Sequence, residues 1–187
     1  ITLQKQKELQ LEQSAIFFEN SNEGILITDA NRKIISVNKA FSKITGYEKE
    51  EVLGKTPSIL SSGVHDKEFY KNMRESLTLN STWKGEIWNK KKNGEIYPEW
   101  LSIAKAVNPK YNEEFYIAIF TDITMIKESD KKLYFYANHD VLTKLANRVN
   151  FETHLKSSLA YCERRNTKIA LFFIDLDKFK DVNDTYG

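Results

Sequence analysis

The sequence predicts an α+β fold, a five-stranded antiparallel sheet with flanking short helices, followed by a linker helix and the start of an α/β domain. Two β-rich runs near the N-terminus and three more after a central helical region predict the antiparallel sheet. Near the C-terminus a helical segment precedes an apolar run that ends in carboxylates, an order typical of α/β folds. We therefore expect one domain and the first part of another.

The first third of the chain predicts a helix, a hairpin and a group of short helices. Residues 2–18 are rich in Gln, Lys, Glu and Leu and contain neither Gly nor Pro, which favours a helix. The β-rich runs 24–29 and 33–38 flank a short polar turn and predict a hairpin. Across residues 39–61 the apolar positions are interrupted by glycines and a proline, so we expect several short helices.

The middle of the chain predicts a longer helix and three strands. Residues 65–79 have an amphipathic pattern with Phe69, Met73 or Tyr70, and Leu77 on one face. Asn93-Gly94 is a strong hairpin signal between the first two strands that follow. We expect these strands at residues 85–90, 96–107 and 115–121.

The last third predicts two helices and a buried strand. Residues 125–137 lack Gly and Pro and predict a connecting helix. Residues 148–165 carry an apolar stripe that includes Cys162, which we interpret as a core residue. The apolar run 168–175 predicts a buried strand, and Asp175 lies at its carboxyl end, where α/β sheets place ligand groups.

The composition indicates a folded chain from a reducing compartment. Of 187 residues, 41% are hydrophobic, and the net charge of +2 is too balanced for a dedicated nucleic-acid or membrane-surface protein. The apolar runs are far shorter than the roughly 20 residues that cross a bilayer, so we expect no membrane span in this segment. The single cysteine excludes an internal disulfide and favours the cytoplasm. Because the chain begins at Ile1 and stops in mid-domain, we expect a piece of a longer protein, and an upstream membrane segment stays open.

An ordered series of short motifs marks the first block of the chain. In chain order the motifs are Glu23-Gly24-Ile25, Asp29, Asn38-Lys39-Ala40-Phe41, Thr45-Gly46-Tyr47, Leu53-Gly54, Trp83-Lys84-Gly85-Glu86, Asn93-Gly94 and Asp122-Ile123-Thr124. With this set, residues 17–124 resemble a PAS sensor domain. The resemblance implies the α+β PAS fold.

A second series of motifs marks the C-terminal block. They are His139-Asp140-Val141-Leu142-Thr143-Lys144-Leu145-Ala146-Asn147-Arg148, Phe151, the run from Phe173 to Lys180, and the run from Val182 to Gly187. Residues 138–187 therefore look like the opening of a GGDEF domain, the family of diguanylate cyclases. One departure is Lys144, because the family more often has Gly there.

Together the two resemblances imply a signal-transduction protein in which a PAS domain regulates the synthesis of cyclic di-GMP from two GTP molecules. They divide the chain into a leading helix at 1–16, the PAS domain at 17–124, a signalling linker helix at 125–137 and a GGDEF fragment at 138–187. Because the GGDEF motif itself is not in the chain, we expect this chain to be inactive. The alternative is a PAS dimerisation module without a small ligand, with a degenerate regulatory GGDEF domain ahead of a phosphodiesterase.

The GGDEF resemblance also implies a site for Mg²⁺ and GTP. Asp175 and the backbone carbonyl of Leu176 would hold the metal, and Asn183 would hydrogen-bond guanine. The residue chemistry agrees, because a hard carboxylate suits Mg²⁺, which binds one or two protein carboxylates plus substrate phosphates. From the spacing alone, the preferred interpretation is that Asp175 and Asp177 merely cap a strand-to-helix turn, and the surrounding motif reverses that preference.

Strand alternation predicts a polar-centred pocket in the PAS block. Trp83, Ile87 and Asn89 share one phase of a strand, and Glu99 and Leu101 share a phase of the next. Since Leu101 is expected to face the core, so is Glu99. A buried carboxylate and a buried amide need hydrogen-bond partners, so we expect these five residues to line a ligand pocket.

FAD is the candidate ligand, because the Trp83 and Asn89 pattern is similar to PAS domains that bind FAD. The alternative is a core tryptophan and an asparagine satisfied by the backbone. No Asn-Cys-Arg-Phe-type segment is present, which argues against a photoreactive LOV flavin site. His65 is a conceivable haem ligand, but its place at a helix start favours a surface residue.

The resemblance assigns signal transmission to the exit of the PAS domain. In PAS proteins the residues matching Asp122 and Thr124 tie the last strand to the following helix, a role that suits short polar side chains. Cyclase chemistry needs two domains face to face, so we expect a homodimer through the PAS domain and the helices. The alternative is a passive spacer helix.

Overall fold

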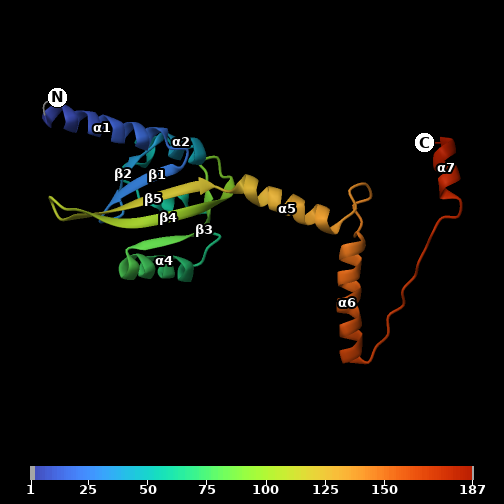
Figure 1. Ribbon diagram of the computed structural model, residues 1–187. Helices are drawn as coiled ribbons and strands as arrows, with labels where there is room; N and C mark the ends of the chain where they lie inside the picture. Colours follow the sequence, from blue (N-terminus) through green and yellow to red (C-terminus); the bar gives the residue numbers. More distant parts are fainter. Residues whose placement is uncertain (1–2, 187) are drawn as a thin grey trace. The chain divides into compact units, whose positions relative to one another are not determined.

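A computed structural model describes residues 3–186 and divides them into two compact units, one ending at Ser129 and one starting at Asp130. The first unit holds a five-stranded sheet in the order β2-β1-β5-β4-β3 (Figure 1). All neighbouring strands are antiparallel, which confirms the predicted sheet. The strands are β1 (Gly24–Asp29), β2 (Ile34–Val37), β3 (Thr82–Lys90), β4 (Ile96–Asn108) and β5 (Glu113–Asp122).

The first and last strands of the unit pair with each other, so the N-terminal hairpin joins the sheet beside its C-terminal strand. Ile27 lies opposite Ile117 in this pairing, and Leu101 lies opposite Phe120 in the next. Local patterns predicted each hairpin, but this long-range pairing follows from burial of both strands against one core. The third strand begins three residues earlier than expected, at Thr82.

Short helices cover one face of the sheet, as predicted. Among them α2 packs on β1, α3 on β2 and α4 on β3, while α1 contacts α2. Asn38 caps α2 by accepting a hydrogen bond from the Phe41 N–H, and Asp66 caps α4 in the same way at Phe69. The helical elements are α1 (Leu3–Asn20), α2 (Lys39–Thr45), α3 (Lys49–Val52), the 3₁₀ turn η1 (Pro57–Leu60), α4 (Lys67–Asn80) and α5 (Thr124–Asn138).

The core of the first unit lies between the sheet and these helices. Phe41 is fully buried and meets Phe120 edge to face, with ring centroids 6.0 Å apart. Met73 is the buried residue of α4, and Phe69, Tyr70 and Leu77 pack partly buried against the core, which confirms the expected face. The buried apolar cluster is Leu26, Ile34, Val37, Phe41, Val52, Leu60, Met73, Ile87, Leu101, Ala118 and Phe120.

The second unit is built differently. It contains α6 (Arg148–Arg165), as predicted, and α7 (Phe179–Tyr186), joined by an irregular segment. The predicted strand at 168–175 is wrong, because a strand needs a hydrogen-bonded neighbour and the described residues supply none for this run. Cys162 is half-buried, not the core residue we expected, since no residue of this unit whose burial is described is fully buried.

The described helices include none with the length and apolar character needed to cross a lipid bilayer.

Candidate functional site

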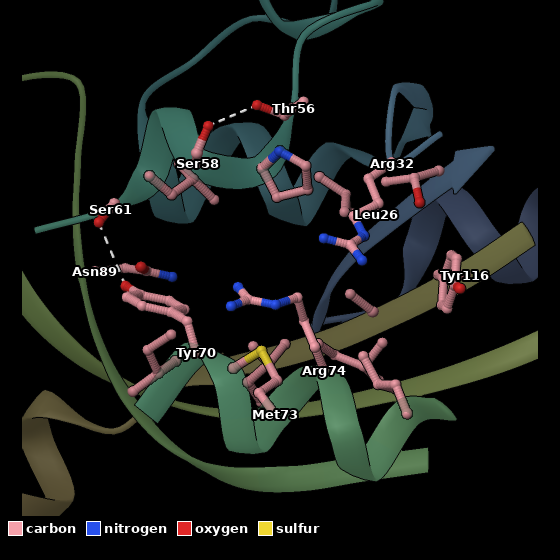
Figure 2. Close-up of a pocket in the computed structure, with 18 of the residues that line it drawn as sticks. Leu26, Arg32, Thr56, Ser58, Ser61, Tyr70, Met73, Arg74, Asn89 and Tyr116 are labelled. Carbon is pink, nitrogen blue, oxygen red and sulfur yellow. Dashed lines mark hydrogen bonds between the residues drawn. The ribbon is translucent and has the colours of Figure 1, made fainter. Parts of the chain in front are cut away.

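A cavity of about 730 Å³ opens between the inner face of the sheet, the η1 segment and α4 (Figure 2). This volume lies in the range of small-molecule pockets. Its walls are mainly apolar, and they include Leu26, Leu60, Met73, Leu101 and Phe120. The cavity sits beside the core cluster and shares these residues with it.

Four of the five residues predicted for the pocket line this cavity, and one does not. Ile87, Asn89, Glu99 and Leu101 are in its wall. The indole of Trp83 instead meets Phe69 edge to face at 5.8 Å and lies over Gly85, where an added Cβ would come within 2.9 Å of the ring. Trp83 is therefore on the predicted side of the strand but outside the cavity lining.

The polar end of the cavity is a hydrogen-bonded triad on adjacent strands. The Asn89 Nδ2 donates to Glu99 Oε1 at 2.8 Å, and the Tyr97 hydroxyl donates to Glu99 Oε2 at 2.6 Å. Glu99 is 1% exposed, and burial raises its pKa to about 7 even though both hydrogen bonds favour the carboxylate. Burial also raises the pKa of the Tyr97 hydroxyl, so it stays protonated. The pocket thus holds a carboxyl group whose charge changes near neutral pH.

The sequence interpretation missed the cavity's opposite, cationic side. Arg32 from the β1–β2 turn, and Lys67 and Arg74 from α4, also line it. Basic residues in a turn or on an exposed helix face are usually solvated, so their sequence positions gave no signal. Ser61 and Tyr70, which share a hydrogen bond of 3.3 Å, complete the wall near Asn89.

His65 lies outside the cavity wall and is hydrogen-bonded to the sheet. Its Nε2 accepts a hydrogen bond from the Trp88 N–H at 2.9 Å, and its ring stacks on Phe69 at 3.9 Å between centroids. A ring nitrogen held in this way is not presented to a haem iron in the cavity. His65 instead fastens the segment before α4 to the edge strand β3, where Ser62 also hydrogen-bonds the Trp88 carbonyl.

The exit of the first unit joins the sheet to α5 through Asp122. Its Oδ1 accepts hydrogen bonds from the Thr124 N–H at 2.9 Å and the Thr124 hydroxyl at 2.5 Å, which caps the start of α5. Lys91 approaches the other carboxylate oxygen at 3.4 Å and lies 5.0 Å from the centroid of the Tyr97 ring. A short polar path therefore runs from the Glu99 triad through Lys91 to the first turn of α5.

Two lysines of the β3–β4 hairpin form ion pairs. Lys91 contacts Glu95 at 2.9 Å as well as Asp122, and Lys92 contacts Glu51 at 2.6 Å. These contacts raise the pKa of both ammonium groups, with the side-chain hydrogen bonds as the main cause. These ion pairs join the hairpin to Asp122 at the end of β5 and to Glu51 on α3.

The residues predicted for Mg²⁺ and GTP lie on the surface of the second unit. Asp175 and Leu176 are exposed in the irregular segment, and Asn183 is exposed on α7. Their oxygen donors suit Mg²⁺ in type. Residues 3–186 nevertheless contain no cluster of three or more His, Cys, Asp or Glu side chains able to hold a metal ion. The structure does not gather these candidates into a site.

Comparisons with known proteins match a different family to each of the two units. The PAS domain family model matches residues 22–125, and the diguanylate cyclase GGDEF domain model matches residues 137–187. A nitrogen fixation regulatory protein from Klebsiella oxytoca is 30% identical over 62% of the chain and 23% of its own length. The probable diguanylate cyclase DgcE from Escherichia coli (strain K12) is 29% identical over 92% of the chain and 16% of its own length.

Two further similarities bear on the first unit. A blue-light photoreceptor from Listeria innocua serovar 6a is 34% identical over 56% of the chain and 42% of its own length. The crystal structure of a PAS domain from Colwellia psychrerythraea covers 62% of the chain and 98% of that domain, with 25% identity and a TM-score of 0.57. The chain spans about a quarter or less of the nitrogen fixation regulator and of DgcE. It belongs to the PAS domain family and carries, after its PAS domain, the N-terminal part of a GGDEF domain.

Proposed function

We propose that this chain is the sensory part of a cyclic di-GMP signalling protein, in which the occupancy of the PAS cavity controls a diguanylate cyclase. One observation carries the proposal: a cavity of about 730 Å³ is connected by a polar path to α5, the helix that precedes the GGDEF segment. The proposed divisions are the PAS domain at 17–124, the linker helix at 125–137 and the GGDEF segment from 138. The protein acts in the cytoplasm, where GTP is available.

Flavin, and FAD in particular, is the proposed occupant of the cavity. An unfilled space of this size supports a ligand-binding role over the alternative of a dimerisation module with a solid core. Similarity to a blue-light photoreceptor supports a light-absorbing ligand, because such a protein needs a chromophore. An absorbance maximum near 450 nm in the purified chain, with flavin identified by mass spectrometry after extraction, is the expected result.

In the GGDEF part, Asp175 and the Leu176 carbonyl are the proposed Mg²⁺ ligands and Asn183 the proposed guanine contact. Mg²⁺ would neutralise the charge on the transferring phosphates. Joining two GTP molecules requires two loaded domains, so the active form is proposed to be a homodimer through the PAS domains and helices. Asp122 and Thr124 would pass the cavity's state to α5.

A double-mutant cycle in the full-length protein tests the coupling. Met73→Trp fills the cavity from α4 and is expected to change the rate of cyclic di-GMP formation from GTP and Mg²⁺. In an Asp122→Ala background the same substitution should leave the rate unchanged, because the cap that links the sheet to α5 is gone. Asp130→Ala, an exposed change on the same helix, should keep the response to Met73→Trp. An Asp122→Ala protein that still responds like the parent would refute Asp122 as the route.

A further inference from the structure

The charged side chains around the cavity are almost all cationic. Arg32, Lys67 and Arg74 line it, and the one acidic residue in the wall, Glu99, is buried in the triad at the polar end. Figure 2 shows the guanidinium groups of Arg32 and Arg74 pointing into the cavity from two different elements. The space between them therefore has a positive potential.

These cations have no partner in the protein itself. Within residues 3–186, Arg32, Lys67 and Arg74 take part in no ion pair, and their side chains make no hydrogen bond. Other lysines of the same unit are paired, including Lys71 with Glu75 one turn before Arg74. Arg32, Lys67 and Arg74 are exposed, so they stay hydrated and unpaired at the cavity wall, and an anionic ligand can replace that water with charge-assisted hydrogen bonds.

The backbone positions of both arginines are fixed by local structure. Arg32 has a left-handed backbone, with φ of 61°, inside a turn closed by its own N–H donating to the Asp29 carbonyl at 3.0 Å. The Lys33 N–H donates to Asp29 Oδ1 at 2.7 Å and tightens the same turn. Arg74 follows Met73, the residue that anchors α4 in the core. The backbone therefore needs no rearrangement when a ligand arrives, and only the two side chains must be ordered.

The rest of this side of the cavity suits a ligand with an apolar body. Leu26, Met73 and Leu77 lie beside the arginines in the wall. The hydroxyl groups of Thr56 and Ser58 in the same wall are hydrogen-bonded to each other, and that of Thr78 donates to the Arg74 carbonyl. A guanidinium pair above such walls recognises a phosphate, sulfonate or carboxylate by charge-assisted hydrogen bonds.

We propose that the cavity selects ligands that carry an anionic group on an apolar body, with the anion held between Arg32 and Arg74. This inference rests on the proposed ligand-binding role of the cavity and adds the chemical class of the ligand. Since Arg32 belongs to the β1–β2 turn and Arg74 to α4, the bound anion ties these two elements together.

A matched pair of fluorescent probes tests the proposal on the purified full chain. The anion 8-anilino-1-naphthalenesulfonate and the neutral N-phenyl-1-naphthylamine share one apolar body and differ in the sulfonate. The anionic probe is expected to bind about tenfold more tightly, an advantage that falls with added salt. Arg74→Gln and Arg32→Gln should each remove most of this advantage, and Lys71→Gln, on the same helix but paired outside the cavity, should keep it.

The outcomes separate the inference from the proposed function. Equal binding of the two probes, or an advantage that survives both arginine substitutions, would overturn the anion site while leaving a cavity that binds ligands. Failure of both probes to bind would overturn the ligand-binding role itself. Displacement of the bound anionic probe by octyl phosphate, by octanoate or by both, but not by octanol, identifies which anion is preferred. Displacement by all three alike would again overturn the proposal.

Discussion

The PAS unit and the GGDEF segment contain similar apolar runs, but these runs are buried in the PAS unit and exposed in the GGDEF segment. In the PAS unit Phe120 on β5 is 3% exposed and Phe41 is fully buried. In the GGDEF segment Phe172, Phe173 and Ile174 are each more than 80% exposed. The difference shows that an apolar run becomes a core strand only when neighbouring strands and a covering layer are present in the same unit.

The helix caps of the two units repeat this contrast. Asn38 and Asn147 each accept a hydrogen bond from the N–H three residues along the chain. Asn38 is 2% exposed, and it also accepts from the Ile25 N–H and donates to the carbonyls of Phe18 and Glu23. The Asn147 side chain makes one further hydrogen bond, from its Nδ2 to the Ala137 carbonyl. The same capping residue therefore belongs to a buried hydrogen-bond network in the PAS unit, whereas in the GGDEF segment it serves mainly as a helix cap.

The largest expected effect is a loss of folding stability, and it tests whether the buried core lies in the PAS unit and not in the GGDEF segment. Phe41→Ala should lower the free energy of unfolding by about 3–5 kcal/mol, because it removes a buried ring that packs on Phe120. Urea unfolding followed by tryptophan fluorescence measures this change, since all three tryptophans lie in the PAS unit. Phe173→Ala, which truncates a ring that is 88% exposed, should change the far-UV dichroism transition little. Comparable losses from the two substitutions would contradict the contrast between the units.

The next effect concerns a buried and an exposed carboxyl group. Because burial raises the pKa of Glu99 to about 7, the folded state keeps its proton at pH values where the unfolded chain has lost it. The stability that Glu99 contributes is therefore fully present below about pH 4.5 and is lost as the pH rises to 7, by about 3 kcal/mol in all. Glu99→Gln should remove this fall.

Urea unfolding at several pH values between 4.5 and 8 measures the effect. Asp177→Asn, an exposed carboxylate of the GGDEF segment, is the control and should leave the fall in place. Parallel pH profiles for the parent and Glu99→Gln would show that Glu99 is ionised in the fold throughout this range.

The smallest effect compares two left-handed turn residues. Gly46 in the PAS unit has φ of 76°, and Lys144 in the GGDEF segment has φ of 61°. Gly46→Ala should destabilise its unit by about 1 kcal/mol, whereas Lys144→Gly should stabilise the turn by up to about 1 kcal/mol. The gain is reduced because the Lys144 ammonium donates to the Val141 carbonyl at 2.6 Å.

Hydrogen exchange at the Thr143 amide, which donates to Asp140 inside this turn, reports the Lys144→Gly result. Slower exchange in the variant is expected. Faster exchange would mean that the lysine contact outweighs the backbone strain.

Local sequence patterns were enough to predict the elements of the PAS unit and the face of each strand that lies inward. Period-two alternation placed Ile87, Asn89, Glu99 and Leu101 on the inner side of their strands, and breaks at glycine and proline located the short helices. These features are local, because the backbone period alone sets which side chains share a face. The same reasoning failed for residues 168–175, since a strand is defined by a neighbour that the local pattern does not contain.

What these inward faces enclose depends on long-range packing. It brought β1 beside β5, left a cavity next to the core, and placed the exposed residues Arg32 and Arg74 on two walls of that cavity. It also moved Trp83 out of the lining by packing its indole on Phe69. Each of these outcomes depends on contacts between residues distant in the chain, where volume, hydrogen-bond partners and charge must be satisfied together, and local periodicity carries no information about them.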